Sequence, residues 1–310
     1  MNDNNRFYYN DFSTYLRRCF GCKVQKITID GGFTCPNRDG SVGRGGCTFC
    51  DNRTFSPAYC NREKSVTEQM RDGIAFFAHK YPAMRYLAYF QAYTNTYAPL
   101  VELQRRYEEA LAVDGCVGLV IGTRPDCMPE ALLDYLQILS KKVYVLVEYG
   151  IESTDERTLI RINRGHDYAV SVDAVCRTAS RGIPVGAHII LGLPGETRGM
   201  LMKQAEELSR LPLTTLKLHQ LQLIRGTRMA SEYYECPQDF SLFTLEEYVE
   251  TVVDYVERLH PGIVLERFAS QSPKDLLIAP DWGIKNYELV EIVKRRMRER
   301  DTWQGKLYSE

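Results

Sequence analysis

Residues 23–50 read KVQKITIDGGFTCPNRDGSVGRGGCTFC, a β-branched run that leads into a glycine-rich loop. The first eight residues are typical of a β-strand. The loop places Cys35, Cys47 and Cys50 directly after that strand, whereas most of the other thiols are scattered through the chain. Glycine permits backbone conformations that other residues avoid, so such a loop can wrap closely around a bulky group. The clustering of three thiols indicates a metal or redox site.

The pattern that begins with this strand repeats along the chain, because short apolar runs alternate with stretches of helical periodicity. Further strands are predicted at 84–90, 117–122, 142–150, 183–196, 216–224 and 262–268, the fifth of which runs on into a loop. Seven strands that alternate with helices indicate parallel β/α units with right-handed crossovers. We therefore expect an α/β fold, a partial (β/α) barrel.

The sequence also predicts how the chain is divided. No Gly/Ser-rich or Pro-rich linker interrupts the β/α alternation. We expect a core barrel over residues 21–270, an N-terminal extension over 1–20 and a C-terminal extension over 271–310.

Composition excludes some classes of protein. The 310 residues include 39 basic and 40 acidic side chains, a net charge of -1, which argues against a bulk electrostatic grip on nucleic acid or an anionic membrane. The first thirty residues hold no apolar run fit for a signal peptide, and no stretch of about 18 apolar residues occurs. We expect a cytoplasmic protein with no membrane segment, in which ten cysteines are not a disulfide framework.

Polar residues follow most of the predicted strands, at the end where β/α barrels carry their chemistry. These segments are QAYTNTY (91–97), GTRPDC (122–127), EYGIES (148–153), GLPGE (192–196) and RGT (225–227). The sequence thus predicts one site that is built from several loops.

The three thiols are one ligand short of a closed tetrahedral zinc site. Either a residue from elsewhere completes a structural zinc site, or the three cysteines hold a [4Fe–4S] cluster and leave one iron open. No histidine lies within the loop, which favours the cluster. A glycine-rich loop with incidental cysteines is the plainest alternative.

The motif TCPNRDG…GGCTFC, with an aromatic residue before its last cysteine, resembles the cluster loop of radical S-adenosylmethionine (SAM) enzymes in a variant with a lengthened first gap. The segments GTRPDC, VEYGIES, INRGHD, HIILGLPGE and LQLIRGT strengthen the resemblance, which covers roughly residues 15–280. It is close to a bacterial subfamily of uncharacterised radical SAM proteins, related to the catalytic subunit of Elongator and to oxygen-independent coproporphyrinogen oxidase.

The resemblance implies that Cys35, Cys47 and Cys50 bind three irons of a [4Fe–4S] cluster and that SAM chelates the fourth. An electron passed through the cluster would cleave SAM to methionine and a 5′-deoxyadenosyl radical, which removes hydrogen from a substrate that the sequence does not identify. The electron would come from a donor such as flavodoxin or ferredoxin. The protein would position the cofactor and exclude water.

The same resemblance suggests the cofactor contacts. Phe49 would meet the adenine, and Glu152 and Arg164 would bind the ribose and the carboxylate. Tyr93, Thr94, Gly122 and His188 are further candidates, although residues 91–94 depart from the glycine-rich form usual at the second strand end. The plainer alternatives are a packing aromatic for Phe49, a surface ion pair for Glu152 and Arg164, and a core histidine for His188.

Other motifs are less well explained by cofactor binding. Arg124 is a candidate for binding an anionic substrate and Cys127 for a thiyl or thiolate role, whereas Asp126 as a helix cap and Cys127 as a buried thiol form the plain alternative. Cys19 and Cys22 form a second CxxC motif with no partner pair nearby. The basic run KRRMRER (294–300) is more typical of a solvated helix face than of an RNA contact.

Two other functions stay open beside the leading one. A tRNA-modifying radical SAM enzyme is suggested by the Elongator relative and disfavoured by the net charge of -1. A non-catalytic zinc or iron–sulfur scaffold would use the three thiols without chemistry.

Overall fold

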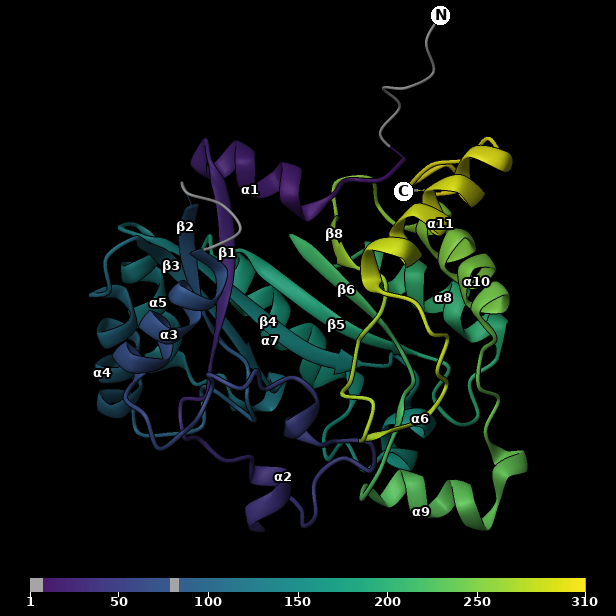
Figure 1. Cartoon of the computed structure of the whole chain (residues 1–310), viewed down its shortest axis with the longest axis horizontal. Helices are drawn as coiled ribbons and strands as arrows, with labels where there is room; N and C mark the ends of the chain where they lie inside the picture. Colours follow the sequence, from purple (N-terminus) through teal and green to yellow (C-terminus); the bar gives the residue numbers. More distant parts are fainter. Residues whose placement is uncertain (1–7, 79–83, 310) are drawn as a thin grey trace, which may run out of the picture.

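The computed structural model describes residues 8–78 and 84–309 and centres on a seven-stranded parallel sheet. The strands lie in the order β1-β2-β3-β4-β5-β6-β8, each beside its predecessor. Their bounds are β1 Lys23–Ile29, β2 Met84–Phe90, β3 Cys116–Thr123, β4 Tyr144–Glu152, β5 Val185–Leu191, β6 Thr215–Gln220 and β8 Val264–Arg267. The sheet curls into a partial barrel, so the predicted fold is confirmed (Figure 1).

Helices connect the strands and cover the sheet, while α1 lies at one end of the strands and α2 and α9 at the other (Figure 1). The helix bounds are α1 Phe12–Phe20, α2 Pro36–Asp39, α3 Val66–Ala78, α4 Leu100–Leu111, α5 Glu130–Ser140, α6 Glu156–Arg161, α7 Tyr168–Ser180, α8 Arg198–Ser209, α9 Arg228–Glu235, α10 Leu245–Arg258 and α11 Asn286–Glu299. Side chains fix several helix starts. Asp155 accepts a hydrogen bond from the backbone N–H of Thr158, and Thr244 with Glu247 forms a capping box.

Alternate residues of the strands face opposite sides of the sheet, and both sides are buried. One set, which includes Ile27, Phe90 and Val147, belongs to the main hydrophobic core with residues of the helices. The other set faces the barrel interior, where Leu87, Val120 and Leu146 pack with Leu16 of α1. Helix α1 therefore closes the barrel at the amino ends of the strands.

A layer of charged side chains also lies inside the barrel, beyond the apolar cluster that packs against α1. Lys26 on β1 and Lys217 on β6 donate to Glu148 on β4 at 2.7 and 2.6 Å, and the two lysines contact Glu266 on β8 at 2.6 and 3.1 Å. His188 on β5 is 3.0 Å from Glu148. Burial by itself would raise the pKa of Glu148, but Lys217 and Lys26 hold it well below its ordinary value. These ion pairs tie five of the strands together.

The predicted strand 216–224 is wrong in its second half. Strand β6 ends at Gln220, and the next backbone N–H, of Leu221, still donates to the carbonyl of Leu191 at 2.9 Å. Because β5 itself ends at Leu191, the chain then leaves the sheet. The short strand β7 (Leu223–Ile224) pairs instead with β9 (Leu277–Ala279), in an antiparallel two-stranded sheet.

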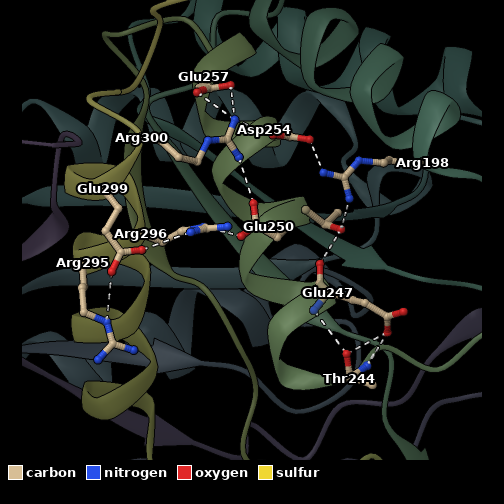
Figure 2. A network of polar contacts seen from close by, with 11 residues as sticks. Arg198, Thr244, Glu247, Glu250, Asp254, Glu257, Arg295, Arg296, Glu299 and Arg300 are labelled. Atoms are coloured by element: carbon tan, nitrogen blue, oxygen red, sulfur yellow. Dashed lines mark hydrogen bonds and ion pairs between the residues drawn. The ribbon is translucent and has the colours of Figure 1, made fainter.

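The C-terminal helix α11 is fastened to α10 by ion pairs (Figure 2). Arg296 pairs with Glu250, and Arg300 contacts Glu250 at 3.2 Å and Asp254 at 2.8 Å. The basic run 294–300 is therefore not simply a solvated face, because part of its charge is matched by α10.

Residues 1–7 of the expected N-terminal extension lie outside the described residues. Within residues 8–78 and 84–309, no helix is both long enough and apolar enough to cross a membrane.

The charged layer predicts a large effect of Glu148→Gln on stability. The change leaves Lys26 and Lys217 buried without the carboxylate between them, so the free energy of unfolding should fall by about 3–5 kcal/mol. Urea unfolding measures this value, with Glu246→Gln on the exposed side of α10 as a control of equal charge change. If both variants unfold within about 0.5 kcal/mol of the unaltered protein, the layer does not stabilise the barrel.

Candidate functional site

A pocket opens at the carboxyl ends of the strands and encloses about 1330 Å³, counting its open mouth. It is lined by residues of the loops that follow β1, β2, β3, β4 and β6, by His188 and Ile190 within β5, and by β8 and the segment after it. The predicted segments 192–196 and 225–227 do not belong to the lining. All the sequence-predicted site residues except Cys127 belong to the lining: Cys35, Cys47, Phe49, Cys50, Tyr93, Thr94, Gly122, Arg124, Glu152, Arg164 and His188.

The loop after β1 is held in shape by its own backbone. Cys35 lies just before the one-turn helix α2, and Pro36 occupies its first position. The carbonyl of Pro36 accepts hydrogen bonds from the backbone N–H groups of Val42 and Gly43. A Cβ atom on Gly43 would lie 2.3 Å from Oδ1 of Asn37, so only glycine fits there without displacing Asn37.

Polar groups surround the thiols, all of which are free. Near the Sγ of Cys47, Nδ2 of Asn37 lies at 3.7 Å and Nη1 of Arg164 at 3.5 Å. Nδ2 of Asn52 is 3.9 Å from the Sγ of Cys50. Burial, assisted by the neighbouring Cys47, raises the pKa of Cys50 to about 11, so metal binding there displaces a proton.

The geometry of the thiols bears on the kind of group they fit. Among the described residues, no three His, Cys, Asp or Glu side chains are grouped so that they could hold a metal ion. A single zinc ion needs its sulfur ligands about 2.3 Å from one point, whereas each thiolate of a cluster binds its own iron. Cys35, Cys47 and Cys50 all line the same pocket.

The end of β4 brings two predicted cofactor contacts beside the cysteine loop. Arg164 donates to the carbonyl of Gly150, and its Nη2 lies 3.9 Å from Oε1 of Glu152. A Cβ atom on Gly150 would lie 2.5 Å from Glu152 Oε1 and 3.0 Å from Arg164 Nη2, so the glycine makes room for both. Burial would lower the pKa of Arg164, but Cys47 and Glu152 raise it above its ordinary value.

Backbone strain is concentrated around the pocket. Tyr93 and Glu152, which line it, and Asn163 beside Arg164 have φ angles of +60°, +68° and +53°. Such angles are uncommon for residues other than glycine and cluster at functional sites.

Several buried polar atoms at the pocket have no hydrogen-bond partner in the described part of the chain. They are Thr94 Oγ1, Arg124 Nη1, Arg164 Nε and His219 Nε2. Because buried polar groups are nearly always satisfied, these atoms point to a polar ligand. Their presence beside the thiols fits a cofactor with carboxylate, hydroxyl and amino groups.

In the segment GTRPDC, Arg124 lines the pocket and Cys127 does not. The guanidinium of Arg124 donates twice to Asp126, at 2.9 and 2.8 Å, so most of its charge is already matched. Asp126 is therefore not the cap of α5, which starts later, at Glu130. Burial raises the pKa of Cys127 to about 12, with Asp126 adding to the shift, and this thiol does not line the pocket.

The structure also shows where His188 and the second CxxC motif, Cys19 and Cys22, lie. His188 lines the pocket and at the same time contacts Glu148 of the charged layer. Cys19 is exposed in α1 and Cys22 precedes β1, at the end of the barrel remote from the pocket.

Part of the lining was not among the site residues predicted from the sequence, including Arg38, Tyr89, Glu148, His219, Arg267 and residues 270–272. Glu148 had a usable signal, because it is a charged residue in the middle of a largely apolar strand, whereas His219 and Arg267 lie in strands that hold other polar residues. The serines and glutamine of 270–272 carried no such signal.

The loop after β5 is linked to the end of β4 by Glu196. Its carboxylate accepts hydrogen bonds from the Ser153 hydroxyl at 2.6 Å and the Leu193 backbone N–H at 3.2 Å. Burial is the main reason that the pKa of Glu196 rises from 4.5 to about 7.

Sequence comparisons agree with this geometry. A family model described as the Radical SAM superfamily matches residues 35–208, and one described as the Radical_SAM C-terminal domain matches residues 213–299. The uncharacterised protein YtqA of Bacillus subtilis is 38% identical over 300 residues, which cover 97% of this chain and 92% of that protein.

More distant proteins share part of the chain. A tRNA uridine(34) acetyltransferase of Methanocaldococcus infernus is 27% identical over 192 residues, 60% of this chain and 34% of that enzyme. The solved structure of Elp3 from the same archaeon, with an N-terminal deletion, superposes with a TM-score of 0.69 over 91% of this chain and 64% of that one, at 17% identity. This structural likeness shows a shared fold.

The environment of Glu196 predicts how stability varies with pH. Between its unfolded pKa near 4.5 and its folded pKa of about 7, the folded protein binds the additional proton, so the free energy of unfolding falls as pH rises through that window. Glu196→Gln has no such proton to lose. Relative to the unaltered protein it should therefore gain about 1–3 kcal/mol in urea unfolding between pH 5 and pH 8. A difference that stays constant over this range contradicts the assignment, because a fixed cost of the amide does not depend on pH.

Proposed function

Because this chain belongs to the radical SAM superfamily, we propose that it holds a [4Fe–4S] cluster on Cys35, Cys47 and Cys50 and uses it to cleave SAM reductively. The observation that carries the proposal is that these three thiols line one pocket with Glu152, Arg164 and several unpartnered polar atoms. When bound, the cluster and SAM supply one-electron cleavage of the sulfonium carbon–sulfur bond, which yields methionine and a 5′-deoxyadenosyl radical for hydrogen abstraction.

The residues around the thiols are suited to bind the polar groups of the cofactor. Arg164, beside Cys47 and Glu152, is suited to bind the carboxylate of the cofactor, and Glu152 is suited to accept hydrogen bonds from its ribose. Thr94, in the loop after β2, offers a hydroxyl that has no hydrogen-bond partner in the described part of the chain. Because Gly150 has no side chain, the side chains of Glu152 and Arg164 both fit beside it.

The remaining contacts follow from the lining of the pocket. Phe49, beside Cys50, offers an aromatic surface to the adenine, and Tyr93, Gly122 and His188 complete the proposed cofactor side. The electron comes from an external donor such as flavodoxin or ferredoxin.

Individual replacement of the three cysteines tests the proposal. After anaerobic reconstitution with iron and sulfide, Cys35→Ala, Cys47→Ala and Cys50→Ala should each lose most of the cluster absorbance. Each should form 5′-deoxyadenosine from SAM and dithionite at least about tenfold more slowly than the unaltered protein. Cys176→Ala, which removes an exposed thiol on α7, is the matched control and should retain both properties.

Two results would contradict the proposal. One is a reconstituted protein that holds its cluster but forms no 5′-deoxyadenosine, which would favour an iron–sulfur scaffold. The other is one tightly bound zinc that survives purification in air and depends on the same cysteines, which would favour a zinc scaffold.

A tRNA-modifying activity is a second candidate, and the likeness to a tRNA uridine(34) acetyltransferase over 192 residues favours it. It predicts that purified protein retains tRNA on a filter at low salt with a Kd of about 1 μM or tighter, and that binding weakens steeply as salt rises. Duplex DNA of similar length is the control. Equal retention of DNA and tRNA, or no retention of tRNA at about 50 mM salt, would remove this candidate.

A further inference from the structure

The charges inside the barrel do not balance. Lys26 and Lys217 are matched by Glu148 and Glu266, two cations against two anions. Arg267 on β8 is a third cation beside this charged layer, and it lines the pocket. Within residues 8–78 and 84–309, no ion pair or side-chain hydrogen bond engages its guanidinium group.

The other arginines of the lining are already engaged. Arg124 is paired with Asp126 and Arg164 with Glu152. Arg38 donates to the carbonyl of Cys50 at 2.7 Å, in the cysteine loop. That carbonyl satisfies an N–H group of Arg38 but does not match its charge, and it ties Arg38 to the cysteine loop. Among the lining arginines outside that loop, Arg267 is therefore the one without an anionic partner in the described residues.

A second unsatisfied group lies near Arg267. One ring nitrogen of His219, Nδ1, is hydrogen-bonded to the hydroxyl of Ser270. The other, Nε2, is buried and has no hydrogen-bond partner among the residues that the structure describes. Burial and the neighbouring His188 and Arg267 lower the pKa of His219, so the ring is neutral. Its Nε2 is the position left for a ligand.

Hydrogen bonds hold the segment that lines the pocket beside Arg267 and His219. We call residues 270–279 the strap; it belongs to the long loop between β8 and α11 (Figure 1). Gln220 exchanges two hydrogen bonds with the backbone of Ser270, at 2.9 and 3.0 Å, and the Ser272 hydroxyl donates to Gln222 at 2.8 Å. The pairing of β7 with β9 anchors its far end.

We propose that Arg267, with His219 beside it, binds an anionic group of the substrate, a carboxylate or a phosphate, on the β6–β8 side of the pocket. Arginine presents two parallel N–H groups that match such oxygens, and a half-buried cation without a partner gains most from a counter-ion. The inference rests on the proposed function, which assigns the β1–β5 side, with Arg164 and His188, to the cofactor. It names Arg267 as a specificity-determining residue.

Simple anions test this subsite without knowledge of the substrate. Thermal melting is recorded with about 50 mM inorganic phosphate or acetate, against chloride of equal ionic strength. The shift in Tm is measured on both the purified and the reconstituted protein, so anion binding can be assessed even if the cluster fails to form. We expect the more tightly bound anion to raise the Tm of the unaltered protein by at least about 2 °C, and its identity tells phosphate from carboxylate.

Three variants give the comparison. Arg71→Gln, on the exposed face of α3, removes the same charge and should retain the full shift in Tm. Arg267→Gln should abolish the shift, and Arg267→Lys should retain part of it because the charge stays while the paired geometry is lost. Equal shifts in the unaltered protein and Arg267→Gln, or no shift of the unaltered protein with either anion, would overturn the proposal. Iron content of reconstituted Arg267→Gln reports separately on the cluster.

Discussion

The buried carboxylate of Glu148 is the interaction on which the rest of the structure depends. It lies 1% exposed between Lys26 and Lys217, with His188 on its remaining side. Removing charges from water is costly unless each is matched, so the layer forms only when β1, β4, β5, β6 and β8 take their native places. It also forms the floor of the pocket, since Glu148 and His188 belong to the lining. The same contacts thus close the barrel and limit the depth to which a ligand can enter.

Above that floor the pocket has two sides of different chemistry. The β1–β4 side carries the thiols, the paired Arg164 and Glu152, and the strained backbone of Tyr93 and Glu152. The β6–β8 side carries Arg267, which has no ion pair within the described residues, the neutral ring of His219 and the strap. A reaction in which a bound cofactor attacks a second molecule requires such a division, because both must be held at once and close together.

Much of the fold was predictable because its signals are local. Strands of a parallel sheet that are buried on both faces read as apolar runs, and the three clustered thiols lie within sixteen residues, from Cys35 to Cys50. The charged layer was not predictable, since Lys26 and Glu148 are 122 residues apart and nothing in either neighbourhood identifies the partner. The end of β6 was missed because it depends on where β5 stops. The roles of the site residues were inferred from a resemblance, and the structure adds that they meet in one pocket.

The most direct test of the central claim is the Mössbauer spectrum of protein reconstituted with the Mössbauer-active isotope of iron, recorded with and without SAM. If three thiols hold a [4Fe–4S] cluster and the fourth iron binds the cofactor, one iron of the four should change its isomer shift when SAM is added, while the other three keep theirs. A spectrum of a [4Fe–4S] cluster that SAM leaves unchanged, or a protein that takes up no cluster, would contradict the account.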